Sequence, residues 1–385
     1  MVAPLNRLIE WRAQRIQDPL ERLRFLRQAT TTSMMLQSTL VKPRRWQMAA
    51  AALLFAMVTI SAFTLARQPA STSAASLPER LSVQGGVRLM PKVWLVETKQ
   101  DSEVYSNGLR VENKYAVNNE PRRSYPVYAR RDAKDTPMEW RSQPSGIVFH
   151  TTESLQLPFE QAATKAIQRV DVDVLGMVRQ NRSYHFMIDK FGQVYRLVKE
   201  SDVAYHAGFS VWGDDRAVFV NLNNSFLSIA IETHTRSDQE TPTATAAQIH
   251  SARVLTQMLR SKYQIPANDC VTHAQVSVNP DNKLLGFHTD WAGNFPFTEL
   301  GLGDNYLEPS AAIDTFGFTY DSTLVNATGS RYWQGLILAE EQMRSQAMNQ
   351  GLSQAEYRKI LQAKYSNILR AVRGNSAEKE KSNEN

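Results

Sequence analysis

The chain has 385 residues, enough for one large or two smaller cores, and its hydrophobic fraction of 42% is ordinary for a globular protein. Residues 1–45 hold nine basic and three acidic side chains, a surplus that equals the whole net charge of +6. The rest of the chain is therefore formally neutral, which argues against a basic groove for nucleic acid. The single cysteine, Cys270, excludes an internal disulfide.

An apolar stretch without charged residues follows this basic head at 46–66. As a helix it is about long enough to cross a hydrocarbon core of ~30 Å, which predicts one transmembrane helix. Lys42, Arg44 and Arg45 precede the stretch, whereas Arg67 alone follows it directly. The positive-inside rule then places the tail 1–45 in the cytoplasm and the remainder on the periplasmic or outer side of the inner membrane. A cleaved signal peptide and a buried core helix are the alternatives.

The region between this span and the centre of the chain carries no cluster of catalytic residue types. Residues 67–83 are rich in Ser, Ala and Pro, which is typical of a flexible linker. Residues 84–143 contain alternating stretches at 93–97 and 106–112, and Asn107-Gly108 is a turn signal. We expect a strand-rich lead-in that packs on the core or forms a small subdomain.

The central region, 144–298, alternates between strand and helix patterns. Apolar runs and helical spacing predict strands at 147–150, 184–188, 193–198, 226–232 and 271–273, with helices at 158–180 and 243–263. The two strands at 184–198 are expected to form a hairpin. This order predicts an α/β fold, with a mixed central β-sheet flanked by helices.

All seven histidines of the chain lie between residues 145 and 297. Imidazole is the common ligand of zinc and the common acid or base near neutral pH. Their clustering indicates a metal site or an acid/base site in this region.

Several motifs of the region occur in the order found in one enzyme family. They are Val-Phe-His150-Thr-Thr, the hairpin from Tyr184 to Tyr195, Tyr205-His-Ala-Gly, Ser228-Ile-Ala-Ile-Glu232, His273-Ala, and Asp290 with Phe295-Pro-Phe. The region resembles the zinc-dependent N-acetylmuramoyl-L-alanine amidases of type 2, which include phage lysozyme-like amidases and are related to animal peptidoglycan recognition proteins. The resemblance implies a Zn²⁺ cofactor. It also implies cleavage of the amide between N-acetylmuramic acid and L-alanine in peptidoglycan or muropeptides.

By this resemblance the metal ligands are His150, His273 and Asp290. A hydrolytic zinc centre uses three protein ligands and leaves one position open, which this set satisfies. The segment 277–287 makes the spacing between His273 and Asp290 longer than is usual in the family. His288 therefore remains an alternative third ligand.

The remaining site residues are also assigned with the help of the family pattern. Glu232 ends an apolar strand and is expected to be the general base. His288 stands where related enzymes often have a lysine that stabilises the oxyanion, and it could donate the same hydrogen bond. Tyr205, His206 and Asn224 are expected to bind substrate. A membrane protein that binds peptidoglycan or muropeptides without cutting them is the alternative function.

Residues 299–373 are predicted to be a loop and helical C-terminal extension, loop-like at 314–330 and helical at 333–349 and 353–373. Ser353 and Glu356 have the spacing of a capping box. The apolar stripe of the last helix is expected to pack on its own domain or to bind a protein partner. The charged residues 374–385 are expected to be a disordered tail.

Overall fold

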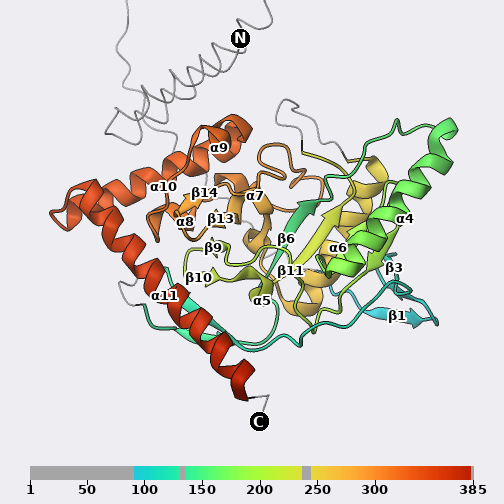
Figure 1. Cartoon of the computed structure of the whole chain (residues 1–385). Coiled ribbons are helices and arrows are strands. Elements are labelled where there is room, and N and C mark those ends of the chain that lie inside the picture. Colours follow the sequence, from blue (N-terminus) through green and yellow to red (C-terminus); the bar gives the residue numbers. More distant parts are fainter. Residues whose placement is uncertain (1–90, 131–134, 236–243, 383–385) are drawn as a thin grey trace, which may run out of the picture. The chain divides into compact units, whose positions relative to one another are not determined.

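The computed structural model describes residues 91–130, 135–235 and 244–382 (Figure 1). Its centre is an eight-stranded mixed sheet with the order β1-β2-β3-β8-β7-β11-β6-β12. The strands are β1 (Leu95–Thr98), β2 (Ser102–Tyr105), β3 (Arg110–Glu112), β6 (Gly146–Thr151), β7 (Phe186–Ile188), β8 (Val194–Arg196), β11 (Phe226–Ile231) and β12 (Cys270–Thr272). The expected mixed sheet is thus confirmed.

The middle of this sheet is parallel and fully buried. Strand β6 runs parallel to β11 on one side and to β12 on the other, and every residue of the three strands is buried. Parallel strands covered on both faces need continuous apolar runs, which these segments have. At the start of β6, a Cβ on Gly146 would lie 2.3 Å from the ring of Phe226, so only glycine fits there.

The predicted lead-in joins the main sheet. Strand β3 pairs with β8 in parallel, and β1 and β2 extend the sheet from there to its edge. Strands β4 (Tyr125–Ala129) and β5 (Glu139–Arg141) instead form a second sheet with β9 (Val211–Gly213) and β10 (Ala217–Val220). The lead-in therefore contributes strands to two sheets that also contain later parts of the chain.

Two long helices cover the two faces of the main sheet. Helix α4 (Thr164–Asn181), which follows a short turn η1 (Gln161–Ala163), packs Leu175 and Val178 near Met187 of β7. Helix α6 (Ala246–Tyr263) belongs to the larger core that includes Phe149 of β6. Thr245 and Gln248 form a capping box at the start of α6. Helix α6 agrees with the prediction at 243–263 to within a few residues, whereas the helix predicted at 158–180 begins later, at Thr164.

Short helices and strands lie between and after the longer elements. They are α5 (Leu222–Ser225), η2 (Ala267–Asp269), α7 (His273–Val276), β13 (Val278–Asn279), β14 (Leu284–Leu285), η3 (Asn305–Leu307), α8 (Ala311–Asp314) and α9 (Ser322–Ala327). The loop predicted at 314–330 thus contains a helix, which Asp321 caps by accepting from two backbone N–H groups. His273 was expected on a strand but begins α7, because Thr272 and Gln275 form a capping box.

The C-terminal extension is helical. Helix α10 (Ser330–Asn349) and helix α11 (Gln354–Ser382) are joined by a turn, and Ser353 and Glu356 form the predicted capping box. The apolar stripe of α11 packs within the same chain, where Tyr365 contacts Phe316 and Phe318. Helix α11 continues as far as Ser382, into the segment for which a disordered tail was expected, and Ala, Glu and Lys in this segment favour a helix.

Within the described ranges, no helix is both long enough and apolar enough to span a bilayer. The predicted cytoplasmic tail (1–45), transmembrane helix (46–66) and linker (67–83) lie outside the described residues.

Candidate metal centre

Three of the predicted site residues meet in one buried group. His150 comes from the end of β6, His273 from the start of α7, and Asp290 from the loop after β14. Nδ1 of His273 lies 2.8 Å from one carboxylate oxygen of Asp290, and Nδ1 of His150 lies 3.4 Å from the other. One ligand atom from each residue can be chosen so that all three lie within 4.8 Å of one another. These residues could hold a metal ion.

The local structure fixes the three side chains independently. His150 is held by the pairing of β6 with β11, where it lies opposite Ala230. The backbone N–H of Ala274 in α7 donates to the carbonyl of Asp290 at 3.1 Å, which ties the loop to the helix. The next residue, Trp291, has a φ of 58° and is buried, so the loop turns sharply and is anchored in the core. Rigid elements of this kind suit a preorganised site.

The charge states of the group also suit a metal. Burial, with a smaller contribution from His273, lowers the pKa of His150 to about 4, so its imidazole is neutral at pH 7. Burial alone would raise the pKa of Asp290, but His273 and the hydrogen bonds from both imidazoles hold it below its usual range. A neutral imidazole and an ionised carboxylate are the forms that bind metals. The donor set therefore fits zinc.

His206 contacts the side of the His150 ring that is remote from Asp290. Its Nδ1 is 3.1 Å from Nε2 of His150, the ring nitrogen that faces away from Asp290. The loop of His206 is fixed because the side-chain oxygen of Asn223 accepts from three successive backbone N–H groups, those of residues 206–208. A second hydrogen bond on the far nitrogen of a metal-binding histidine orients its ring and selects its tautomer. The structure thus brings His206 to the centre, at the back of His150.

Tyr205 and Asn224 lie in a different place from the three grouped residues. Both line a cavity of about 340 Å³ together with Trp140 and Val372. None of His150, His273 and Asp290 is among the described residues that line it. The phenol of Tyr205 is 46% exposed and donates to the carboxylate of Glu120 at 3.0 Å. The expected substrate-binding set is therefore divided between the centre and this cavity.

Glu232 is buried, with 1% of its surface exposed. Ala230 pairs with His150 in the sheet, and alternation places Glu232 on the same face two residues further along. Its carboxyl lies next to that of Asp171 on α4, but among the described residues neither oxygen has a hydrogen bond of good geometry. Burial and the neighbouring Asp171 raise the pKa of Glu232 to about 9. It therefore holds a proton at pH 7.

His288 lies at the edge of the centre. Its exposed ring stacks on His273, with 4.7 Å between ring centroids, and its backbone N–H donates to the hydroxyl of Ser277. The grouped ligand atoms come from Asp290 and the other two histidines, so the geometry favours Asp290 over His288 as the third ligand.

Asp171 and the role of Asn223 were missed in the sequence analysis. For Asp171 a signal was available, because it falls on the buried stripe of α4 with Ile167, Val174, Leu175 and Val178. A carboxyl group on the apolar face of a helix is unusual and indicates a special environment. For Asn223 the pattern gave no such signal, since an asparagine in a turn is common.

The family of the region follows from comparison with known proteins. Residues 140–288 match the family model described as N-acetylmuramoyl-L-alanine amidase. This region is of the N-acetylmuramoyl-L-alanine amidase family. The resemblance predicted from the motifs is thereby confirmed, and the match supports a peptidoglycan amidase activity. The matched amidase region ends at His288, just before Asp290.

Several solved structures are similar to this amidase region. They include the endolysin amidase LysCS from Clostridium intestinale (23% identity, 41% of this chain and 81% of that chain, TM-score 0.26). AmiD from E. coli with a bound substrate has 17% identity and a TM-score of 0.32, and the match covers 64% of this chain and 98% of that chain. AmpDh3 from Pseudomonas aeruginosa with anhydromuramic pentapeptide has 19% identity and a TM-score of 0.30, and the match covers 61% of this chain and 94% of that chain. No curated protein matches the chain.

Proposed function

We propose that residues 144–298 form a zinc-dependent amidase domain. It would cleave the amide bond between N-acetylmuramic acid and L-alanine in peptidoglycan or muropeptides. The observation that carries this proposal is the buried group of His150, His273 and Asp290 within a region that matches the amidase family. These three residues would hold the metal, and His206 would orient His150 from behind. When bound, zinc would supply Lewis acidity, which polarises a carbonyl and lowers the pKa of water.

Glu232 is proposed to move the proton in this reaction. In the hydrolysis of an amide, a general base takes a proton from water, and the leaving amine must receive one. Glu232 projects from the same face of the sheet as His150 and is shielded from solvent. Since its pKa is raised to about 9, its side-chain oxygen holds a proton that it can donate to the amine. Its action as a base requires the ionised form, whose fraction increases as the pH rises toward 9.

The exposed imidazole of His288 is proposed to assist at the carbonyl oxygen. It stacks on His273, which places a hydrogen-bond donor beside the three proposed ligands. An N–H aimed at a developing oxyanion stabilises the transition state. Tyr205 and Asn224 would contact a part of the substrate more distant from the scissile bond, in their own cavity.

A non-catalytic peptidoglycan-binding protein is the second candidate. The raised pKa of Glu232 favours it, because a protonated carboxyl cannot act as a base at neutral pH. The two candidates differ in whether peptides are released from the substrate.

The experiment incubates the full-length protein with purified peptidoglycan and with muropeptides, with and without a chelator followed by zinc. Released material is identified by mass spectrometry. Free peptides that begin at L-alanine, lost with the chelator and in His150→Ala and restored by zinc in the unmodified protein, would support the amidase. Retention on the polymer without any released peptide would reject the amidase in favour of the binding protein.

We also propose that the segment 46–66 anchors the protein in the inner membrane, with the amidase domain on the periplasmic side. The support is the charge-free apolar run and the lysine and arginine residues that precede it. Protease treatment of spheroplasts tests this proposal. Digestion of the amidase domain in intact spheroplasts is the expected result, whereas protection until lysis would contradict it.

A further inference from the structure

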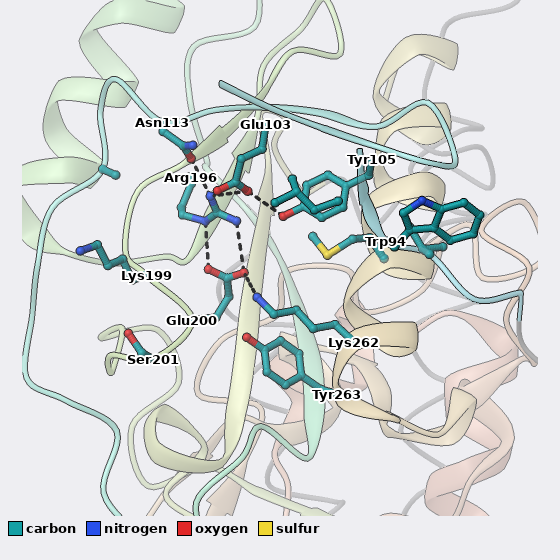
Figure 2. A pocket seen from close by; sticks show the side chains of 14 residues that line it. Trp94, Glu103, Tyr105, Asn113, Arg196, Lys199, Glu200, Ser201, Lys262 and Tyr263 are labelled. Carbon is teal, nitrogen blue, oxygen red and sulfur yellow. Dashed lines mark hydrogen bonds and ion pairs between the residues drawn. The ribbon is translucent and has the colours of Figure 1, made fainter. Parts of the chain in front are cut away.

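A second cavity, of about 700 Å³, lies at the edge of the main sheet (Figure 2). Its walls come from three parts of the chain that are distant in sequence. They are the strands β1 and β2 of the lead-in, the end of β8 with the turn that follows it, and the last turns of α6. Its volume is within the usual range for small-molecule sites, roughly 300–1,000 Å³.

This cavity is on the opposite face of the sheet from the metal centre. Arg196 pairs with Phe186, which pairs with Ile229, which pairs with Phe149, so these four side chains project from the α6 face. His150 is the residue after Phe149 and projects from the other face. A ligand bound in this cavity would therefore be separated from the proposed catalytic groups by the sheet itself.

The floor of the cavity is a network of charged groups around Arg196. The guanidinium donates to both oxygens of Glu200, at 2.9 and 3.2 Å, to Glu103 at 2.9 Å and to the side chain of Asn113 at 2.6 Å. Tyr105 donates to the same oxygen of Glu103 at 2.6 Å. Arg196 and Glu200 are each about 6% exposed. These mutual bonds fix the floor before any ligand arrives.

The groups left available for a ligand are two ammonium groups and two aromatic rings. Lys199 is exposed, and its Nζ makes no hydrogen bond or ion pair with any described residue. Nζ of Lys262 contacts Glu200 at 3.3 Å and lies 5.0 Å from the ring centroid of Tyr263, and it keeps a further N–H donor for a ligand. Figure 2 shows these two lysines on either side of Glu200. The ring of Trp94 is 58% exposed, and Tyr263 also lines the cavity.

The charge of the lining favours an anionic ligand. Three cations, Arg196, Lys199 and Lys262, face two carboxylates, Glu103 and Glu200, and both carboxylates already bind Arg196. The lining that remains is apolar on the side of Val93, Trp94, Leu95 and Met258. An occupant that satisfies both features carries carboxylates and a short aliphatic part.

We propose that this cavity binds a short acidic peptide, with its carboxylates at Lys199 and Lys262 and its aliphatic part against Trp94. The site would be independent of the metal centre, and the proposal does not depend on the proposed hydrolysis. The chain would then have a second binding site for acidic peptides, on the α6 face of the main sheet, which has no proposed catalytic residue.

The test measures binding to the full-length protein by isothermal titration calorimetry. The probe is N-acetyl-L-alanyl-D-glutamate, which has two free carboxylates and no amine, and the matched neutral ligand is its diamide. We expect the diamide to bind at least about tenfold more weakly than the probe, which corresponds to ~1.4 kcal/mol. Binding of the probe should also weaken as salt is added, because its carboxylates meet partly exposed cations.

Variants assign the binding to the cavity. Lys199→Glu should weaken binding of the probe at least about tenfold and leave the melting temperature unchanged, since Lys199 is exposed and its ammonium pairs with no described residue. Lys359→Glu, an exposed lysine of α11 outside the cavity, and His150→Ala at the metal centre should bind as the unmodified protein does. The absence of binding at millimolar probe, equal binding by Lys199→Glu, or loss of binding in His150→Ala would overturn the proposal.

Discussion

Around Arg196, two carboxylates, one amide oxygen and a guanidinium satisfy one another in a buried network. Around Glu232, two carboxyl groups lie side by side in a buried place, and the nearby Lys190 donates to Gln156 instead. Both clusters are part of the same sheet and its covering elements. The first has the arrangement expected of a structural network, in which each charge meets an opposite charge. The second leaves buried oxygens without good partners, which is expected where chemistry takes place.

The largest expected effect tests whether the pair of Glu232 and Asp171, whose buried oxygens lack good hydrogen-bond partners, is the functional cluster. Glu232→Gln keeps the size of the side chain but removes the carboxyl that could move a proton. We expect the release of peptides from muropeptides to fall about 10²–10⁴-fold, the usual contribution of a general acid or base. The initial rate of release is the measurement. The control is Glu97→Gln on the exposed strand β1, which should retain full activity. Equal rates for the two variants would remove Glu232 from the mechanism.

The next effect tests whether the Arg196 network is structural. Arg196→Met removes the guanidinium from buried Glu200 and from partly buried Glu103, and leaves Glu200 with the more exposed Lys262 as its remaining cation. We expect a loss of about 3–5 kcal/mol in the free energy of unfolding, the usual cost of leaving a buried charge unpaired. Urea titration measures it. Arg110→Met removes an exposed pair with Glu112 and should cost no more than about 1 kcal/mol. Similar losses in the two variants would show that the network does not stabilise the fold.

A smaller effect concerns the dependence of stability on pH. The pKa of Glu232 is about 9 in the folded protein and roughly 4.3 in an unfolded chain. Between these values the folded state keeps a proton that the unfolded state releases, so the stability contributed below pH 4.3 is lost as the pH rises toward 9. The loss is at most about 1.4 kcal/mol per pH unit.

Glu232→Gln cannot release a proton and should remove this dependence. Urea titrations at pH 5 and pH 8 should therefore show that its advantage in stability over the unmodified protein is greater at pH 8. Asp171→Asn removes the neighbouring carboxyl but leaves the burial that is the larger cause of the raised pKa, so it should remove only part of the dependence. An advantage for Glu232→Gln that is the same at both pH values would contradict the raised pKa.

The smallest effect concerns the support of the proposed metal ligands. His206→Ala removes the ring nitrogen that lies 3.1 Å from Nε2 of His150. We expect the affinity for zinc to fall about 10–100-fold, as is usual when the partner behind a ligand is lost. Competition with a chromogenic chelator measures the affinity without recourse to activity. His250→Ala, on the surface of α6, is the control. Unchanged zinc affinity in His206→Ala would show that His150 is oriented without it.

The sequence by itself determined the order and type of the central elements. The hairpin of β7 and β8, the helices α4 and α6 and the buried strands β6 and β11 were predictable, because each has a local period of two or 3.6 residues or a continuous apolar run. The motif order also predicted His150, His273 and Asp290 as one group. In contrast, capping residues start short helices at His273 and after Asp321, and the hydrophobic pattern did not predict these helices.

Only the tertiary structure decided which side chains meet. Asp171 reaches Glu232 because α4 covers the same face of the sheet, and His206 reaches His150 because its loop is fixed by Asn223. The register of β6, β11, β7 and β8 places Arg196 on the face opposite His150. The periodicity of the sequence indicates which face of a helix or strand is buried. Contacts between distant segments depend instead on strand register and side-chain packing, which are fixed only when the whole core forms.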